Sequence, residues 1–193
     1  FYLFKKWSFF LSIKYTQIVQ NLPSSVPFVG PEAQERVLGK SFGARIGANE
    51  SVFGPSPKAI LAMKNEIGEA WKYGDPESFD LKHALAKKHN VEFKNIIVGE
   101  GIDGLLGYLV RLFVEQGDNV VTTDGAYPTF NYHVEGFGGK LHKVPFKNDK
   151  EDLDKLLLKV KQTSAKLLYV SNPNNPMGTI NTKTSIENLI SNL

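Results

Sequence analysis

The sequence of 193 residues contains no cysteine. This absence excludes disulfides, thiolate metal sites and cysteine nucleophiles, and it is compatible with a cytoplasmic protein. The net charge is only +3, and no basic stripe is interleaved with aromatic residues. We therefore expect no nucleic-acid partner, and we predict no metal site.

Long apolar runs are also missing from the N-terminal segment. Its longest uncharged apolar stretch, residues 7–13, is much shorter than the ~20 residues that a membrane-spanning helix needs. This stretch is followed by Lys14 and not by the small residues of a cleavage site. A signal peptide is therefore not predicted. We expect no membrane partner, and we expect residues 1–20 to form an extension without fixed structure.

What the chain does contain is a regular alternation of helical and strand patterns. Hydrophobic residues make up 41% of the chain and charged residues 22%, as in globular proteins. Ser56, Asp149 and Thr184 are expected to cap helices at their N-termini, and Gly117 to end one. The predicted strands are residues 95–99, 119–124, 140–146 and 166–171.

This alternation predicts an α/β fold with a mostly parallel sheet flanked by helices on both faces. In such sheets, ligands bind beyond the carboxyl ends of the strands, where loops meet helix N-termini. Three loops that follow predicted strands are chemically unusual, and they are the candidate binding regions.

The first of these loops, VGEGIDG at residues 98–104, is rich in glycine. The backbone N–H groups of Ile102 and Asp103 open a predicted helix, which makes an anion site suited to phosphate. The spacing G-x-G-x-x-G also fits a dinucleotide-binding fingerprint, with Asp124 at the end of the next strand. A tight strand-to-helix turn is the third interpretation, and this motif alone leaves all three open.

The second loop, DGAYPTFNYH at residues 124–133, carries three aromatic residues around a proline: Tyr127, Phe130 and Tyr132. An aromatic ring at a strand end can stack on a flat heterocycle. Taken alone, the loop fits ordinary core or surface aromatics better.

The third loop, SNPNNPMG at residues 171–178, follows a buried strand. Asparagine supplies an uncharged hydrogen-bond donor, and the flanking prolines restrict the backbone, which suits a side chain that must hold a ligand. We predict that the Asn175–Pro176 peptide bond is cis, because X–Pro bonds adopt this form most readily.

Several motifs together resemble the pyridoxal-phosphate-dependent aminotransferases of class I/II, the fold-type I group. Within this group the motifs most resemble the histidinol-phosphate aminotransferase branch, and the resemblance covers roughly residues 20 to 193. The motifs that carry it are residues 47–57, 71–78, 98–121, 124–133 and 171–179.

The resemblance implies roles for individual residues in binding pyridoxal 5′-phosphate. Phe130 stands where the family places the aromatic ring that stacks on the pyridine ring. Asn175 would donate its amide to the phenolic oxygen of that ring. The phosphate would lie at the start of a helix formed by Gly101, Ile102, Asp103 and Gly104.

The resemblance also implies a homodimer with shared sites. Tyr73 matches a tyrosine that reaches the cofactor phosphate of the neighbouring subunit, and Asn49 lies near the substrate in this family. The implied reaction transfers an amino group from an amino acid, or an amino-alcohol phosphate, to a 2-oxo acid.

The family pattern assigns residues 21–72 to an N-terminal arm and first helix. Residues 73–193 would be the N-terminal part of the large cofactor-binding domain, truncated at the C-terminus. The lysine that binds the cofactor covalently, the aspartate on the pyridine nitrogen and the substrate-binding arginine are expected beyond residue 193. Lys166 and Lys183 do not match the family position of that lysine. The chain as given is therefore expected to be inactive.

Two alternative functions stay open at this point. A nicotinamide-dependent oxidoreductase would use the glycine fingerprint of residues 99–104 and Asp124, but it gives the asparagine-rich loop no role. A module that keeps this fold without catalysis is the other alternative.

Overall fold

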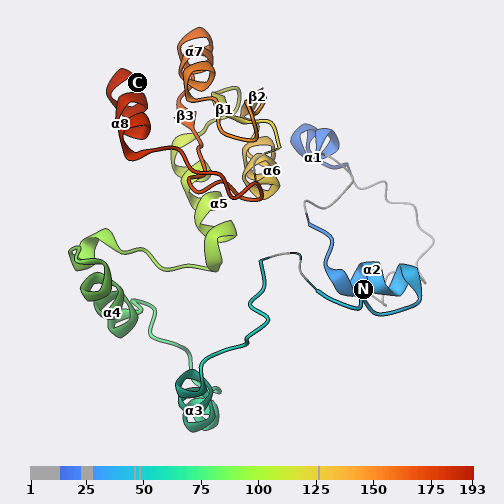
Figure 1. Ribbon diagram of the computed structural model, residues 1–193, viewed down its shortest axis with the longest axis vertical. Coiled ribbons are helices and arrows are strands. Elements are labelled where there is room, and N and C mark those ends of the chain that lie inside the picture. The colour runs from blue at the N-terminus through green and yellow to red at the C-terminus, as the bar shows by residue number, and fades with distance from the viewer. Residues whose placement is uncertain (1–13, 23–27, 46, 48, 126) are drawn as a thin grey trace. The chain divides into compact units, whose positions relative to one another are not determined.

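The computed structural model describes residues 14–22, 28–45, 47, 49–125 and 127–193 (Figure 1). The predicted extension, residues 1–20, lies largely outside these residues; its described part leads into helix α1, Gln17–Asn21. The chain divides into two compact units. One unit is residues 29–102, and the other contains the sheet, residues 103–193, together with the described residues up to 28. Nowhere in the described ranges is a helix both long and apolar enough to cross a membrane.

The unit of residues 29–102 is helical and contains α2, α3 and α4 with two short 3₁₀ turns. The cap predicted at Ser56 is confirmed, because its hydroxyl oxygen accepts the N–H of Ala59 at 3.1 Å and Pro57 follows at the first helical position. The elements are α2 Pro31–Leu38, α3 Pro57–Glu66, η2 Ile67–Glu69, α4 Phe79–His89 and η3 Phe93–Asn95.

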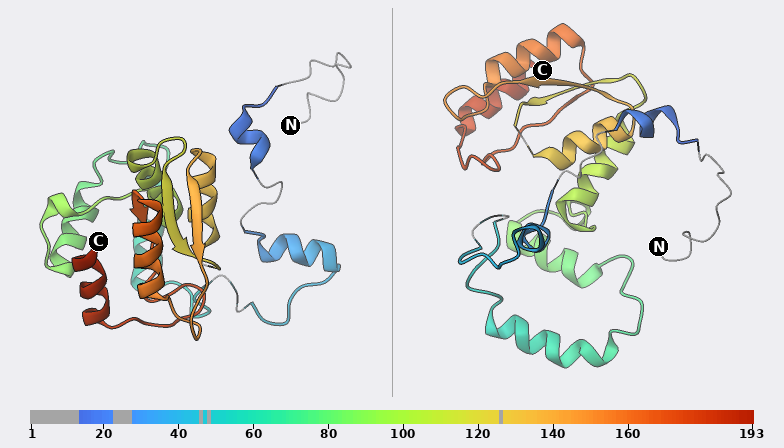
Figure 2. Two further views of the ribbon diagram at one scale, coloured as in Figure 1. Left: turned by 90° about the horizontal axis from the view of Figure 1, so that it is seen from above. Right: turned by 90° about the vertical axis from the view of Figure 1, so that its right-hand side faces the viewer.

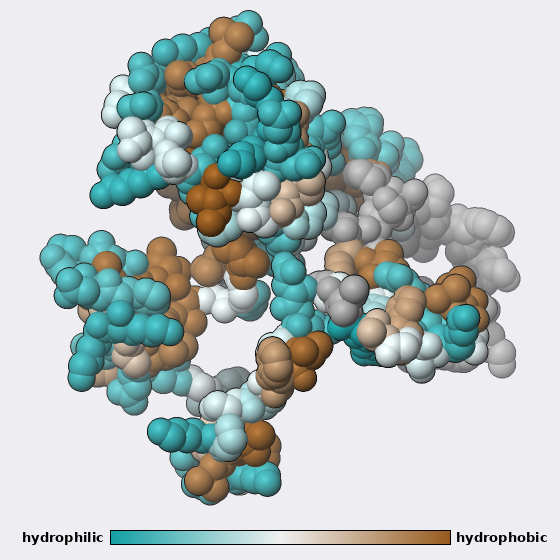
Figure 3. Space-filling view, in the orientation of Figure 1, coloured by the Kyte–Doolittle hydropathy of each residue, from teal (hydrophilic) through white to brown (hydrophobic). Residues whose placement is uncertain are grey.

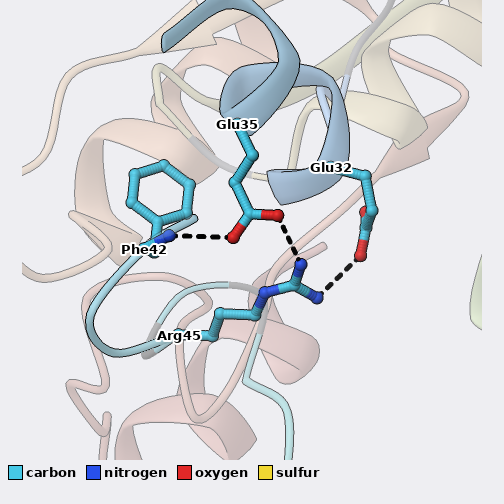
Figure 4. A network of polar contacts seen from close by, with 4 residues as sticks. All are labelled: Glu32, Glu35, Phe42 and Arg45. Carbon is cyan, nitrogen blue, oxygen red and sulfur yellow. Dashed lines mark hydrogen bonds and ion pairs between the residues drawn. The ribbon is translucent and has the colours of Figure 1, made fainter. Parts of the chain in front are cut away.

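An ion-pair network fastens the segment after α2 back onto that helix (Figure 4). Arg45 donates one hydrogen bond to Glu32 and one to Glu35, each at 2.7 Å, and the N–H of Phe42 donates to the other oxygen of Glu35 at 2.9 Å. The Phe42 amide and the Arg45 guanidinium lower the pKa of Glu35. This network fixes the chain shortly before Asn49, the residue expected near the substrate.

The strand predicted at residues 95–99 is not formed. Asn95 closes the 3₁₀ turn η3, and Ile96 has an extended backbone at φ −106° and ψ 124°. Ile97 is 76% exposed, and no described segment pairs with it as a strand. The apolar pattern predicted a strand, but a strand also needs a neighbour that supplies backbone hydrogen bonds.

The sheet unit is built on three parallel strands in the order β2-β1-β3, which confirms the predicted α/β class. Asn119 pairs with Lys140, and Val120 pairs with both Leu141 and Leu167. The strands occupy the predicted positions with shorter bounds: β1 Asn119–Thr123, β2 Lys140–Val144 and β3 Leu167–Leu168.

Helices cover both faces of this sheet (Figure 2). Helices α5 (Gly101–Phe113) and α6 (Pro128–Gly136) pack on the face that carries Val120. Helix α7 (Leu153–Thr163) packs on the opposite face, where Leu156 contacts Val121 and Val144. Because β1 is buried from both sides, its side chains form two apolar cores, as expected for a parallel strand.

Two of the predicted helix caps are displaced along the chain. Asp149 does not cap α7, because it lies in a turn with a positive φ of 59°; the cap is Asp152, whose carboxylate accepts the N–H of Lys155 at 3.1 Å. Helix α8, Lys183–Asn192, is capped by Thr182 rather than by Thr184. In each case the residue that caps is the one whose extended or turn-like backbone aims its oxygen at the helix.

Gly117 does not end α5 directly. The helix ends at Phe113, and Gly117, with φ 91°, lies in the turn that leads into β1. Its N–H donates to the carbonyl oxygen of Gly138 at 2.8 Å, so it joins two turns at the same end of the sheet.

Gly107 of α5 lies directly against the His133 side chain of α6, which allows a test of the packing of this layer. A Cβ atom on Gly107 would lie 2.8 Å from Cε1 of His133, so Gly107→Ala is expected to lower the free energy of unfolding by about 1–3 kcal/mol, as over-packing does. Gly136→Ala, on the same helix pair with open space around it, is the matched control and should be neutral or stabilise by up to about 1 kcal/mol. Equilibrium urea unfolding measures both; equal effects of the two changes would contradict this packing.

Candidate functional site

The glycine-rich loop leads into the first turn of α5. Gly101 has a positive φ of 72°, and a Cβ built on it would meet no atom within 4 Å. Ile102 is 59% exposed, and Asp103 and Gly104 follow in the same turn. The first turn of a helix presents backbone N–H groups that lack partners within the helix, so this end offers donors in front of an open glycine.

Tyr127 joins the start of α5 to the start of α6. Its hydroxyl donates a hydrogen bond of 2.5 Å to a carboxylate oxygen of Asp103, and Pro128 begins α6 directly after it. This hydrogen bond, followed by partial burial, raises the pKa of Tyr127. The tyrosine ring is therefore held beside the helix end that carries the predicted phosphate-binding residues.

Phe130, the residue expected to stack on the cofactor ring, lies in the hydrophobic core. This placement disagrees with the expected stacking role. Its side chain is 1% exposed and belongs to the core cluster with Val134 and Val120. One face of its ring stacks on Tyr169, with the centroids 4.3 Å apart and the planes 19° apart. A ring enclosed in this way offers no face to a ligand, whereas Tyr127 does not share this burial.

Tyr169 links the glycine-rich and asparagine-rich loops electrostatically. Burial is the main cause that raises the pKa of Tyr169, while its hydrogen bond with Ser171 lowers it. The charges of Glu151 and Asp103 both raise this pKa further. The Tyr169 ring also stacks on Phe130 of α6, so the segments that follow β1 and β3 meet at this ring.

The asparagines of the third loop divide into two roles. Asn172 holds the ends of the loop together, because its carboxamide donates to the carbonyl of Asn181 at 3.1 Å and accepts the N–H of the same residue at 2.8 Å. Asn174 is 4% exposed, and its carboxamide oxygen accepts the N–H of Met177 at 3.1 Å. These two side chains shape the loop itself.

Asn175, the predicted ligand-binding residue, follows directly and is partly buried. The Asn175–Pro176 peptide bond is cis, as predicted, and the Asn172–Pro173 bond is cis as well. The role of its carboxamide toward a ligand stays a prediction.

Sequence reasoning missed Glu151, which is buried beneath this loop. It is 4% exposed, and one carboxylate oxygen accepts a hydrogen bond of 2.8 Å from the carboxamide nitrogen of Asn174. Burial raises the pKa of Glu151, and the donors from Asn174 and the Ser171 amide offset part of this effect. The signal in the sequence was a carboxylate directly before the helix cap Asp152, which looks like a solvated residue.

The two remaining predicted site residues belong to the other unit. Tyr73 is fully exposed, and Asn49 has a positive φ of 55°. Their approach to a cofactor or substrate stays a prediction. No group of three or more potential metal-ligating side chains occurs among the described residues.

Comparison with known proteins connects these loops to one family. The family described as "Aminotransferase class I and II" matches residues 44–193, which include all three candidate loops. The histidinol-phosphate aminotransferase of Moorella thermoacetica is 32% identical over 167 residues, covering 86% of this chain and 43% of that protein. Histidinol-phosphate aminotransferase 2 of Carboxydothermus hydrogenoformans is 32% identical over 172 residues, covering 89% and 47%.

A solved structure shares the fold closely. The histidinol-phosphate aminotransferase of Sinorhizobium meliloti, in complex with pyridoxal-5′-phosphate, superimposes with a TM-score of 0.88 and 51% identity, covering 94% of this chain and 48% of that one. The chain thus spans about half the length of these relatives. These matches favour the aminotransferase interpretation of the glycine loop, and nothing in them supports the oxidoreductase alternative.

The buried carboxyl of Glu151 predicts a pH dependence of stability. Its pKa is above the ordinary value of 4.5, so the folded state binds the proton more tightly, and this contribution is lost as the pH rises through the raised pKa. Glu151→Gln removes the titration; relative to this variant, the wild type should lose unfolding free energy as the pH rises from below 4.5 toward neutrality. Urea unfolding of both proteins at a series of pH values measures the difference, and a difference independent of pH would contradict the assignment.

Proposed function

Because this chain belongs to the family of class I and II aminotransferases, we propose that the protein containing it transfers amino groups with pyridoxal 5′-phosphate as cofactor. The amino donor is an amino acid or an amino-alcohol phosphate, and the acceptor is a 2-oxo acid. The match over residues 44–193 carries this proposal, since it includes the glycine-rich, aromatic and asparagine-rich loops together.

The residues at the start of α5 suit a phosphate group. The amides of Ile102 and Asp103, with Gly104 behind them, would hold the cofactor phosphate, and the open space before Gly101 admits it. Bound pyridoxal phosphate acts as an electron sink that stabilises the negative charge left when the substrate loses a proton.

Tyr127 takes the stacking role in this proposal, in place of Phe130. It follows the end of β1 directly, and its hydroxyl is fixed by Asp103, which keeps the ring at the predicted phosphate end. Asn175 would donate its amide to the phenolic oxygen of the ring, and Asn49 would contact substrate. Stacking and hydrogen bonding would orient the ring so that the reacting bond is held in one direction.

The lysine that binds the cofactor covalently is proposed to lie outside this chain, as are the pyridine-nitrogen aspartate and the carboxylate-binding arginine. Such a lysine has to lose its proton to react. Lys166 instead forms an ion pair of 3.0 Å with Asp118, which raises its pKa, and Lys183 lies 3.7 Å from Glu187. We therefore expect the 193 residues alone to be inactive.

A homodimer is proposed from the surface of residues 29–102. Apolar side chains are exposed along this unit, and Figure 3 shows brown surface around α3 and α4. A second copy of the chain would cover such a surface and would bring Tyr73 to the neighbouring cofactor phosphate. Because the sequence contains no cysteine, which suits a reducing compartment, we expect a cytoplasmic enzyme. The exposed apolar residues include Val52, Phe53, Leu61, Ile67, Trp71 and Tyr73.

Cofactor binding by the full-length protein tests the proposed function. Purified protein incubated with pyridoxal phosphate should show a visible absorption band that survives desalting, and a wild-type preparation should convert a 2-oxo acid to an amino acid. Asn175→Ala should weaken cofactor binding by about 10-fold, as expected for one lost hydrogen bond to a charged oxygen. Binding of a nicotinamide dinucleotide without this band would support the oxidoreductase, and the band without turnover would support the non-catalytic module.

Shared sites in the dimer are tested by complementation. Tyr73→Phe should raise the Kd of the cofactor by about 10-fold, because a hydrogen bond to phosphate is lost, whereas Tyr132→Phe should have no effect. A mixed dimer of one Tyr73→Phe subunit and one Asn175→Ala subunit contains one intact site if Tyr73 acts across the interface. Such mixed dimers should recover about half of the wild-type cofactor sites; no recovery would show that Tyr73 acts within its own subunit.

A further inference from the structure

We infer that Glu151 is a positioning residue for the cofactor ring, acting through Asn174 on Asn175. This inference rests on the proposed function and extends it to a residue outside the family motifs described above. Glu151 touches neither substrate nor cofactor in this proposal; it fixes the loop that carries the ring-binding carboxamide.

The contact between Glu151 and Asn174 is enclosed. Both side chains are 4% exposed, and the carboxamide nitrogen of Asn174 lies 2.8 Å from a carboxylate oxygen of Glu151. The carboxamide oxygen of Asn174 is already used by the N–H of Met177 at 3.1 Å. The orientation of the Asn174 side chain is therefore set from both ends.

The backbone of Asn174 is bound as firmly as its side chain. Its N–H donates to the carbonyl oxygen of Thr179, and its own carbonyl oxygen accepts the N–H of Gly178, both at 2.8 Å. The hydroxyl of Thr179 donates to the carbonyl oxygen of Asp149 at 2.7 Å, which is a second connection between the same two loops. Asn175 follows in the turn that these bonds define, so its direction depends on the segment around Glu151.

A carboxylate suits this position better than an apolar side chain would. A buried amide N–H without an acceptor is costly, and Glu151 supplies that acceptor to Asn174. The residue also precedes the first turn of α7, where the helix dipole favours negative charge. Its second carboxylate oxygen is buried without a hydrogen-bond partner among the described residues, and the other oxygen accepts the side-chain hydrogen bond from Asn174.

The charged and titratable groups around Glu151 come from several elements. Burial and, after it, the charge of Glu151 raise the pKa of Tyr169, which follows β3. Asp152 is the next residue after Glu151 and caps α7. Lys147 and Lys150 line the adjoining cavity of about 600 Å³ together with Asp154. Neither lysine forms an ion pair with Glu151 among the described contacts, and the side chain that donates a hydrogen bond to Glu151 is Asn174.

The first test compares two changes of Glu151 in the full-length protein with cofactor. Glu151→Leu keeps the approximate size and removes the acceptor, while Glu151→Gln keeps an acceptor oxygen and removes the charge. Glu151→Leu should raise the Kd of pyridoxal phosphate by about 10-fold, and Glu151→Gln should stay within about 3-fold of wild type. Lys150→Gln, an exposed neighbour, is the control and should bind as wild type does.

A spectroscopic measurement separates positioning from general stability. If Asn175 donates to the phenolic oxygen, its displacement raises the proton affinity of that oxygen. The pH midpoint of the visible absorption of the bound cofactor should therefore rise by about one unit in Glu151→Leu and stay unchanged in Glu151→Gln. Loss of a buried charge need not destabilise the fold, so unfolding curves of the two variants supply the stability comparison.

A paired exchange provides a second test that does not depend on Glu151→Leu folding. Asn174→Asp places two carboxylates against each other and should weaken cofactor binding by more than about 10-fold. Adding Glu151→Gln to Asn174→Asp restores one donor and one acceptor in reversed order, and it should recover binding to within about 3-fold of wild type.

The outcomes distinguish this inference from the proposed function. If the wild-type protein does not bind the cofactor, both the proposed function and the positioning role of Glu151 are overturned. A wild type that binds, together with a Glu151→Leu protein of unchanged Kd and pH midpoint, removes only the positioning role. A double variant that binds no better than Asn174→Asp alone also overturns it.

Discussion

The pairing of β1 on both of its edges is the constraint on which the sheet unit depends. Val120 and Val121 are fully buried on opposite faces, and both neighbouring strands run parallel to β1. Parallel pairing sends every strand end to the same edge of the sheet, and the connecting helices begin there. The chemistry of the molecule follows from this topology, because loops distant in sequence receive a common location. The ring stack between Phe130 of α6, which follows β1, and Tyr169, which follows β3, is a direct result of that arrangement.

The sequence predicts this arrangement well where apolar residues recur periodically. It predicts the arrangement poorly where an element forms only if another segment pairs or packs with it. The strands of the sheet were found because apolar runs and turn residues coincide, yet residues 95–99 carry the same pattern and pair with no strand in the part of the chain that the structure describes. The two aromatic side chains differ in burial for a related reason. Phe130 and Val134 are four residues apart and both fully buried, as on one face of a helix, whereas Tyr127 precedes that helix and packs against the edge of the same core while staying partly exposed. Family likeness pointed to the loop, and the position at which the helix starts decides which of the two rings is fully buried.

Local rules also have limits at helix ends, where several candidates compete. Asp149 and Asp152 both precede a helical pattern, and only the backbone conformation selects Asp152. The asparagine-rich loop shows the same limit on a larger scale. Its composition signalled a rigid binding loop, but it did not show that Asn172 and Asn174 serve the loop itself, through hydrogen bonds to Asn181, Glu151 and Met177. Composition reports how many amides are present, while hydrogen-bond geometry reports which of them are already used.

The buried carboxylate of Glu151 shows why a binding loop can require a residue that does not favour stability. Its raised pKa means that ionisation at neutral pH costs free energy of folding, and an apolar residue would avoid this cost. An apolar residue would, however, leave the donor of Asn174 without an acceptor and the following turn without its anchor. In the proposed function the ring of the cofactor has to be held in one orientation, so an error of direction at Asn175 would be more damaging than a modest loss of stability. We therefore interpret the Glu151 carboxylate as a residue that fixes the orientation of the loop at Asn174 and Asn175, at a cost in folding free energy.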